Sequence, residues 1–350
     1  MPRLRRADCS SPGITRRRAG RGFAYYDCNG ARVDDPDTLD RIRALAIPPA
    51  WTDVWICPWP HGHIQAVGTD ARGRKQYRYH DRWRLRRDQE KFDHMLEFAA
   101  ALPALRAALC ERLQHRGPEL DRERVLACAT RLLDLGFFRI GTEGYAEQNQ
   151  TYGLATIRKS HVKVRDGIVT FDYTAKSGKR RIQSIVDLDV CEVVTALKAR
   201  RGGNPELLAY QRDGDGSWCD VRSADINAFV KELTGGDFTA KDFRTWNATV
   251  LCAVALAVST EATSPTARKR AVVRAVKEVS HYLGNTPAVC RSSYIDPRVV
   301  DRYQAGVTIG GALTKLGADV AFGQLSTQGA IEAAVLEMLA DAPDAAVAAA

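Results

Sequence analysis

Five short segments hold the residues of this 350-residue chain that are most able to do chemistry. Each sets a polar side chain beside glycine, proline or aromatic neighbours that suit a turn or a helix end. They are Phe138-Arg-Ile-Gly141, Tyr173-Thr-Ala-Lys-Ser-Gly178, Lys241-Asp-Phe-Arg-Thr-Trp246, Leu283-Gly-Asn-Thr-Pro287 and Arg291-Ser-Ser-Tyr-Ile295. Between them they supply a tyrosine, two arginines, a lysine and an amide for one reaction.

These side-chain types match the needs of phosphodiester cleavage. That reaction needs an oxygen nucleophile, cations or donors on the non-bridging oxygens, and an acid for the departing hydroxyl. For either arginine alone an ordinary ion pair is the simpler interpretation, because Glu143 lies near Arg139 and Asp242 lies near Arg244. The combination with Tyr294 favours the chemical interpretation.

The elements that must position these residues can be read from the hydrophobic pattern. Two alternating segments, 162–164 and 168–173, flank Arg165-Asp-Gly167, which is a strong signal for a hairpin turn. A third strand, 180–186, follows the Lys176 turn. Helices are predicted from about residue 92 to 135 and over most of the chain to about residue 306. The first of these series repeats through Met95, Phe98, Leu102, Leu105, Leu109 and Leu113.

The N-terminal quarter has a different composition. Residues 1–22 mix Arg, Gly, Ser and Pro with few large apolar side chains, so they predict a mobile basic arm. Short apolar runs broken by turn residues predict a small sheet-rich domain from residue 23 to about 79. Residues 70–94 interleave arginine and lysine with aromatics, which favours a surface facing nucleic acid over a merely solvated charged face.

The overall charge agrees with a polyanionic partner. The formal net charge is +9 and the pI is about 9.1, which suits nucleic acid or an anionic membrane surface. No apolar run approaches the roughly 20 residues of a membrane helix, and the arginine-rich start has no apolar leader core. The prediction is therefore a soluble, cytoplasmic protein.

The cysteines give no framework for a metal site. There are nine, without a C-x-x-C pair or a Cys/His cluster at zinc-ligand spacing, which indicates reduced structural thiols. The chain also has no G-x-x-x-x-G-K-[ST] phosphate loop. We expect no cofactor-binding residue and no metal ligand.

The five segments, in this order, resemble the active-site motifs of type IB DNA topoisomerases, above all the small poxviral and bacterial enzymes, over roughly residues 23–306. The resemblance implies that Tyr294 attacks the scissile phosphate to give a 3′-phosphotyrosyl link and a free 5′-hydroxyl. It implies that Arg139 and Arg244 bind the non-bridging oxygens. Asn285 stands nine positions before Tyr294, and this spacing matches that of the family. The base that takes the phenol proton stays open.

Two family positions leave alternatives. Lys176 matches the lysine that protonates the 5′-oxygen, but Lys179 at the same turn is a competitor. Asn285 stands where poxviral and cellular relatives carry histidine, while bacterial members resemble this chain. His281, four residues earlier, could be mistaken for that histidine, and we interpret it as structural.

The resemblance also implies contacts with duplex DNA away from the chemistry. Arg74-Lys-Gln-Tyr-Arg-Tyr79 resembles a Lys-Gln-Tyr-x-Tyr element at the major groove, so Lys75, Gln76, Tyr77 and Tyr79 are candidate DNA-binding residues. Tyr145, six residues after Arg139, matches a further tyrosine of the poxviral pattern.

The predicted fold class is α+β, with a small β-rich N-terminal domain and a mainly helical catalytic domain that contains a short antiparallel sheet. The predicted divisions are residues 1–22, the basic arm; 23–91, the DNA-binding domain; 92–310, the catalytic domain; and 311–350, an Ala-rich tail. The predicted function is ATP-independent relaxation of supercoiled double-stranded DNA by a monomer in the bacterial nucleoid. A tyrosine recombinase is the first alternative, and a basic DNA-binding protein without catalysis is the second.

Overall fold

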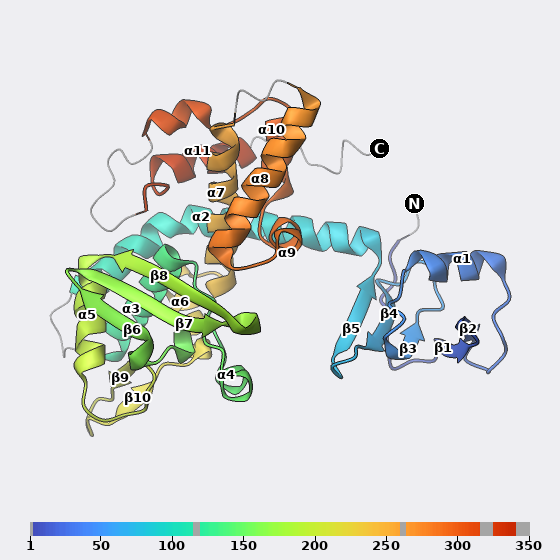
Figure 1. Ribbon diagram of the computed structural model, residues 1–350, viewed down its shortest axis with the longest axis horizontal. Helices are drawn as coiled ribbons and strands as arrows, with labels where there is room; N and C mark the ends of the chain where they lie inside the picture. The colour runs from blue at the N-terminus through green and yellow to red at the C-terminus, as the bar shows by residue number, and fades with distance from the viewer. Residues whose placement is uncertain (1–2, 115–119, 260–263, 316–324, 341–350) are drawn as a thin grey trace. The chain divides into compact units, whose positions relative to one another are not determined.

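The computed structural model describes residues 3–114, 120–259, 264–315 and 325–340. The chain divides into two compact units, residues 1–93 and 94–350, whose elements are labelled in Figure 1. The first unit is built around a sheet and the second is mainly helical, so the α+β prediction is confirmed. None of the helices in the described ranges has the length and apolar character needed to cross a membrane.

A five-stranded antiparallel sheet with the order β2-β1-β3-β4-β5 forms the first unit. Its elements are β1 (Ile14–Ala19), β2 (Gly22–Tyr26), α1 (Pro36–Ala44), β3 (Thr52–Ile56), β4 (Ile64–Thr69) and β5 (Lys75–Tyr79). Ile42 of α1 packs on Ile14, Val54 and Ile56 to make a small core. In the strand order given above, β5 is last and is therefore an edge strand of the sheet.

The predicted basic arm is wrong for much of residues 1–22, because β1 lies inside it and pairs with both β2 and β3. The guanidinium of Arg16 explains how so basic a segment folds. It donates to the backbone oxygens of Ile47, Pro48 and Trp51. Composition alone gave no sign of carbonyl acceptors more than 30 residues away.

The second unit is built from helices around two small sheets. The helices are α2 (Asp81–Gln114), which starts in the first unit, α3 (Arg122–Gly136), α4 (Glu143–Asn149), α5 (Leu188–Ala199), α6 (Ser223–Thr234), α7 (Ala240–Ala257), α8 (Pro265–Leu283), α9 (Pro287–Ser293), α10 (Pro297–Gln304) and α11 (Ala330–Ala340). The apolar residues predicted to repeat from Met95 to Leu113 are all buried. α7 packs against α3, α8, α10 and α11.

A three-stranded antiparallel sheet, β6 (Val162–Arg165), β7 (Ile168–Ala175) and β8 (Lys179–Val186), confirms the predicted strands. The turn between β6 and β7 is the two-residue loop Asp166-Gly167, with positive φ at both residues, as a hairpin of this handedness requires. α3 and α5 pack against this sheet (Figure 1). The small sheet β9 (Ala209–Gln211) and β10 (Trp218–Asp220) completes the strands of the described ranges.

The predicted Ala-rich tail is part of the folded unit in its described portion. α11 packs against α7 and α10, and its Ile331, Val335 and Leu339 are buried at helical spacing. The alanine content hid this apolar face. Residues 341–350 of the predicted tail lie outside the described residues.

Candidate active site

Arg244 occupies the first turns of α7, and its position depends on a capping box. Thr239 and Asp242 cap each other's backbone, with Thr239 N–H donating to the Asp242 carboxylate at 2.8 Å. Asp242 is thereby used at the helix start and forms no ion pair with Arg244. The Glu143 carboxylate likewise accepts from the backbone of Ser223 and not from Arg139. The two ion-pair interpretations are therefore wrong.

The guanidinium of Arg244 is held by the ends of two helices. Arg244 is only 4% exposed. It donates to the oxygen of Phe137, which caps α3, and to the oxygen of Leu283, the last residue of α8, at 2.9 Å. Carbonyls at helix C-termini carry partial negative charge, so they stabilise the cation without neutralising it. Burial, with the charge of Arg139, lowers the pKa of Arg244 to about 10, which leaves it charged at neutral pH.

Arg139 leaves α3 on a loop that two glycines hold in place. Gly141 has a φ of +76°, and a Cβ on Gly153 would lie 2.5 Å from the Cα of Gly141. Phe138 is fully buried beside Arg139, and the Arg139 oxygen accepts from Leu154 at 2.8 Å. This close backbone contact aims the Arg139 side chain at Asn285, whose Oδ1 accepts from Nη2.

Asn285 is fixed by the end of α8. Gly284 caps that helix with a φ of +65°, and the Asn285 N–H donates to Ser280 at 3.0 Å. Since Oδ1 accepts from Arg139, the amide must present Nδ2 as its free donor. Nδ2 is buried and has no partner within the described residues, and the same holds for Nε of Arg244. Two buried donors beside Arg139 therefore lack an acceptor.

Tyr294 follows directly after α9, and its N–H donates to Cys290 at 3.0 Å. The Arg244 guanidinium carbon lies 5.2 Å from the centre of the phenol ring. Burial by itself raises the pKa of the phenol, but the charges of Arg244 and Arg139 outweigh it, and the pKa is lowered below its usual value. The site thus makes the Tyr294 phenol easier to deprotonate than a phenol in water.

Lys176 and Lys179 lie at the tip of the hairpin formed by β7 and β8. Lys176 begins the turn between β7 and β8, Lys179 begins β8, and both are exposed. Within the described residues, no hydrogen bond or ion pair joins either amine to the other four residues, so Lys176 stays a prediction with Lys179 as its competitor. His281 is exposed in the last turn of α8, where its ring lies edge-on to that of Tyr282 and its backbone oxygen accepts from the Gly284 N–H.

Arg181 is a residue of this region that the sequence analysis missed. It lies opposite Tyr173 in the β7–β8 pairing, and it donates to the oxygen of Tyr282 at 2.6 Å. The positive charge of Arg139 acts to lower the pKa of Tyr173 and the pKa of Arg181. The alternation along β8 could have indicated it, because Arg181, Gln183 and Ile185 share one face.

Comparison with known proteins agrees with this geometry. Residues 80–309 match the family described as eukaryotic DNA topoisomerase I, catalytic core, and residues 22–70 match the bacterial DNA topoisomerase IB N-terminal domain. The chain is 32% identical to DNA topoisomerase 1B of Acanthamoeba polyphaga mimivirus over 83% of its own length and 88% of that protein. It is 19% identical to DNA topoisomerase 1B of vaccinia virus, strain Copenhagen, over 77% and 82%.

The chain belongs to the type IB DNA topoisomerase family. The catalytic-core match spans Tyr294, Arg139, Arg244, Asn285 and Lys176. The enzyme class is therefore type I DNA topoisomerase, and the predicted resemblance is confirmed.

The predicted DNA-binding residues of this type IB family member lie on the edge strand β5. Lys75, Tyr77 and Tyr79 are exposed and share one face, and the two tyrosine rings stack with centroids 6.0 Å apart. Gln76 points to the opposite face, where its Nε2 donates to Asp70 at 3.0 Å. The exposed face offers a cation beside flat rings, while Gln76 has a partner within the protein.

Tyr145 is the remaining predicted contact. Its backbone falls in α4, and its side chain lies outside the described residues.

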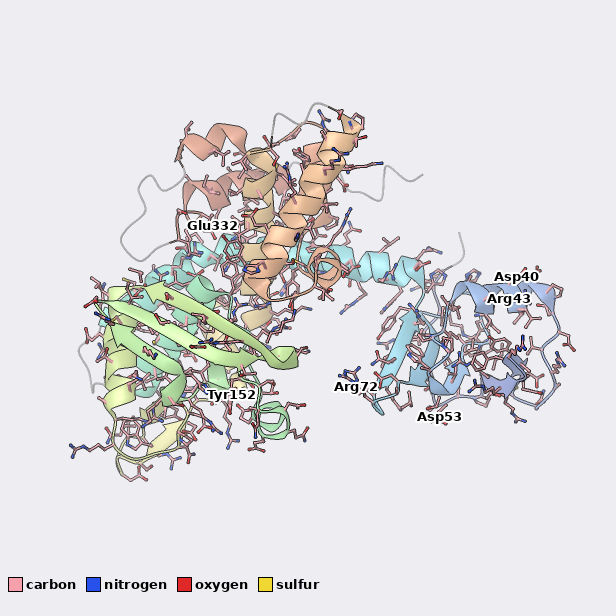
Figure 2. The ribbon with its side chains drawn as sticks, in the orientation of Figure 1. Asp40, Arg43, Asp53, Arg72, Tyr152 and Glu332 are labelled. Carbon is pink, nitrogen blue, oxygen red and sulfur yellow. The ribbon has the colours of Figure 1, made fainter. Side chains whose placement is uncertain are left out.

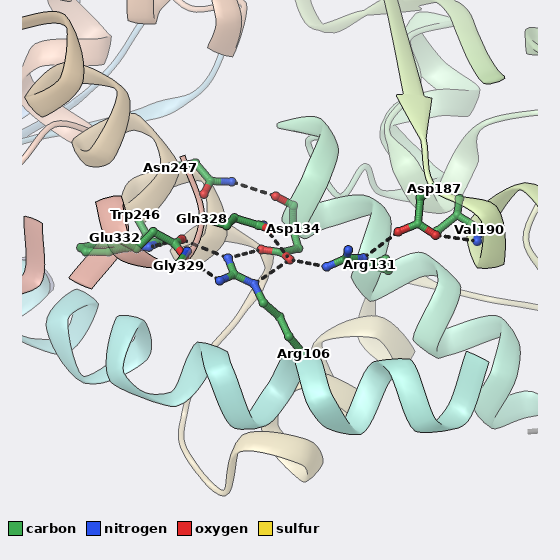
Figure 3. A network of polar contacts seen from close by, with 10 residues as sticks. All are labelled: Arg106, Arg131, Asp134, Asp187, Val190, Trp246, Asn247, Gln328, Gly329 and Glu332. Carbon is green, nitrogen blue, oxygen red and sulfur yellow. Dashed lines mark hydrogen bonds and ion pairs between the residues drawn. The ribbon is translucent and has the colours of Figure 1, made fainter. Parts of the chain in front are cut away.

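A buried polar network supports α3, which ends three residues before Arg139, and α7, which carries Arg244 (Figure 3). Asp134 on α3 binds Arg106 through both oxygens and also accepts from Arg131. Arg106 and the Trp246 indole both donate to Glu332 of α11. The network therefore joins α2, α3, α7 and α11. Its contact on α7 is Trp246, two residues after Arg244.

Removing the central carboxylate should destabilise the second unit. Asp134→Asn removes the anion that the largely buried Arg106 and Arg131 share and leaves them with Glu332 and Asp187. Losing hydrogen bonds between charged groups costs about 1.5 to 3 kcal/mol. Urea unfolding measures the loss. Asp40→Asn is the control, because its pair with Arg43 is exposed on α1 (Figure 2) and should change stability by about 0.5 kcal/mol or less. Equal effects of the two variants would contradict the structural role.

The charge of Arg139 should set the titration of Tyr294. Burial raises the pKa of the Tyr294 phenol, and the charge of Arg139 lowers it. Because Arg139→Gln removes that charge, the phenol pKa should rise. NMR titration of tyrosine labelled at Cζ measures this in the free protein. Arg180→Gln is the matched control, since Arg180 is exposed and paired with Asp172. An unchanged Tyr294 titration in Arg139→Gln would count against the electrostatic argument.

Proposed function

We propose that this chain relaxes supercoiled duplex DNA by transient cleavage of one strand through Tyr294, rotation of the free end, and resealing. The observation that carries the proposal is the set of groups around the phenol. The side chains of Arg139, Arg244 and Asn285 converge there. Within the described residues, neither arginine forms an ion pair with a carboxylate. Such a group of cations and donors fits a phosphodiester, whose single negative charge is shared by two non-bridging oxygens.

The cleavage step follows from these positions. The Tyr294 oxygen attacks phosphorus, the bond from phosphorus to the 5′-oxygen breaks, and a 3′-phosphotyrosyl ester forms. Arg139 and Arg244 bind the non-bridging oxygens, and Nδ2 of Asn285 is free to donate to one of them. The phenol proton leaves to solvent, helped by the lowered pKa of Tyr294.

Lys176 is proposed to protonate the departing 5′-oxygen. It sits on the turn between β7, which carries Tyr173, and β8, which carries Arg181, and an ammonium is a suitable general acid. In the reverse step the same amine takes the proton from the 5′-hydroxyl, and that oxygen displaces Tyr294.

The energy of the phosphodiester is kept in the tyrosyl ester, so resealing needs no ATP. The guanidiniums supply the charge neutralisation, so we propose activity without added metal. All five residues belong to one chain, which supports action as a monomer. The exposed face of β5, with Lys75, Tyr77 and Tyr79, is proposed to contact the duplex.

Tyr294→Phe tests the central claim. In EDTA without ATP, the wild type should relax supercoiled plasmid, and the variant should lose at least about a thousandfold in rate because the nucleophile is absent. Binding to the same plasmid should persist. A wild type that binds but never relaxes the plasmid would move recombination or simple DNA binding ahead, and relaxation by Tyr294→Phe would reject the nucleophile.

A substrate with sulfur in place of the bridging 5′-oxygen tests the acid. A thiolate leaves without protonation, so this substitution should restore cleavage to the variant that lacks the acid. We expect rescue for Lys176→Ala and near-normal cleavage of ordinary DNA by the control Lys179→Ala. Rescue of Lys179→Ala instead would transfer the role to Lys179.

A further inference from the structure

Arg181 has no role in the mechanism above, although it lies on the inner face of the β6–β8 sheet. The register places it opposite Tyr173, and places Gln183 opposite Phe171. Tyr173 and Phe171 are buried and pack on Phe138. The sheet therefore turns the Arg181 side chain inward, toward the loop that carries Arg139.

Its neighbour Arg180 has the opposite environment. Arg180 is exposed on the outer face and makes a two-pronged pair with Asp172. Two adjacent arginines of one strand thus differ in burial and in pairing. That difference provides a matched comparison within the same hairpin.

Two nitrogens of Arg181 are already used by the protein. Nε donates to Gln183, whose amide in turn donates to the Gly136 oxygen at the end of α3. Nη2 donates to the Tyr282 oxygen in the last turn of α8, at 2.6 Å. These bonds fix the guanidinium between the helix ends that also hold Arg244.

Nη1 is the remaining donor group. A Cβ on Gly284 would lie 2.8 Å from it, so Nη1 lies against the residue that precedes Asn285. Among the described residues no acceptor for Nη1 is seen. Gly284 is the residue that permits this approach, because any side chain there would meet the guanidinium.

Arg181 adds a third positive charge beside Arg139 and Arg244. Burial lowers the pKa of Arg181, Tyr173 opposes this, and Arg139 lowers it further. Arg181 also contributes to the lowered pKa of Arg244. None of Arg139, Arg181 and Arg244 pairs with a carboxylate in the described residues. Three partly buried like charges repel one another, and an anion would relieve that repulsion.

We infer that Arg181 is a third phosphate-binding cation of this active site, whose Nη1 donates to a DNA backbone oxygen at the scissile phosphate or the phosphate next to it. The inference rests on the proposed function. It adds a residue to the reaction and assigns Arg181 a DNA contact beyond its structural bonds.

Single-turnover cleavage and binding of a duplex oligonucleotide test it. Arg181→Gln should slow cleavage about tenfold or more and reduce the slope of log affinity against log salt by about one. Arg181→Lys should recover part of both, because it keeps the charge. Arg180→Gln should behave like the wild type. Equal behaviour of Arg181→Gln and Arg180→Gln would overturn the inference while leaving the proposed function in place.

Neutral methylphosphonates separate a phosphate contact from a merely structural defect. They are placed one at a time at the scissile phosphate and its two neighbours. At the phosphate that Arg181 binds, the difference between wild type and Arg181→Gln should disappear in binding and cleavage. A defect that persists at all three positions rejects the contact. A wild type that cleaves no DNA at all rejects the proposed function, and the inference falls with it.

Discussion

The burial of a positive charge beside Tyr294 is the constraint on which the site depends. A guanidinium as buried as that of Arg244 is costly unless it is bound. This fold binds it with the backbone oxygens of Phe137 and Leu283. A carboxylate would have met the same need more strongly, but it would have cancelled the charge that a phosphate requires.

The rest of the catalytic unit can be understood as support for that choice. α3 and α8 must end where their carbonyls face α7, so Gly136 is followed by a left-handed Phe137 and Leu283 is followed by a left-handed Gly284. The carboxylates that stabilise the unit lie elsewhere, in the network around Asp134 and Glu332. Arg106 and Arg131 have carboxylate partners and hold the helices together, whereas Arg244 has carbonyl partners that leave its positive charge uncompensated.

Much of the site was predictable because the signals are local. The tight turn Asp166-Gly167, the spacing of Asn285 and Tyr294, and the apolar repeat of α2 each depend on residues close in sequence. The same reasoning failed for the N-terminal arm. It failed because Arg16 finds its acceptors in Ile47, Pro48 and Trp51, and no composition rule reports partners at that separation.

The sequence by itself determined which chemistry is available: a tyrosine, two arginines, an amide and two candidate lysines in an order typical of one enzyme family. Only the tertiary structure decided how they are used. It showed that Asp242 caps α7 instead of pairing with Arg244, that Asn285 turns its oxygen to Arg139, and that Arg181 faces inward. The physical reason is distance along the chain. Arg244 and Phe137 lie 107 residues apart, so packing and not local spacing brings the cation to the carbonyl.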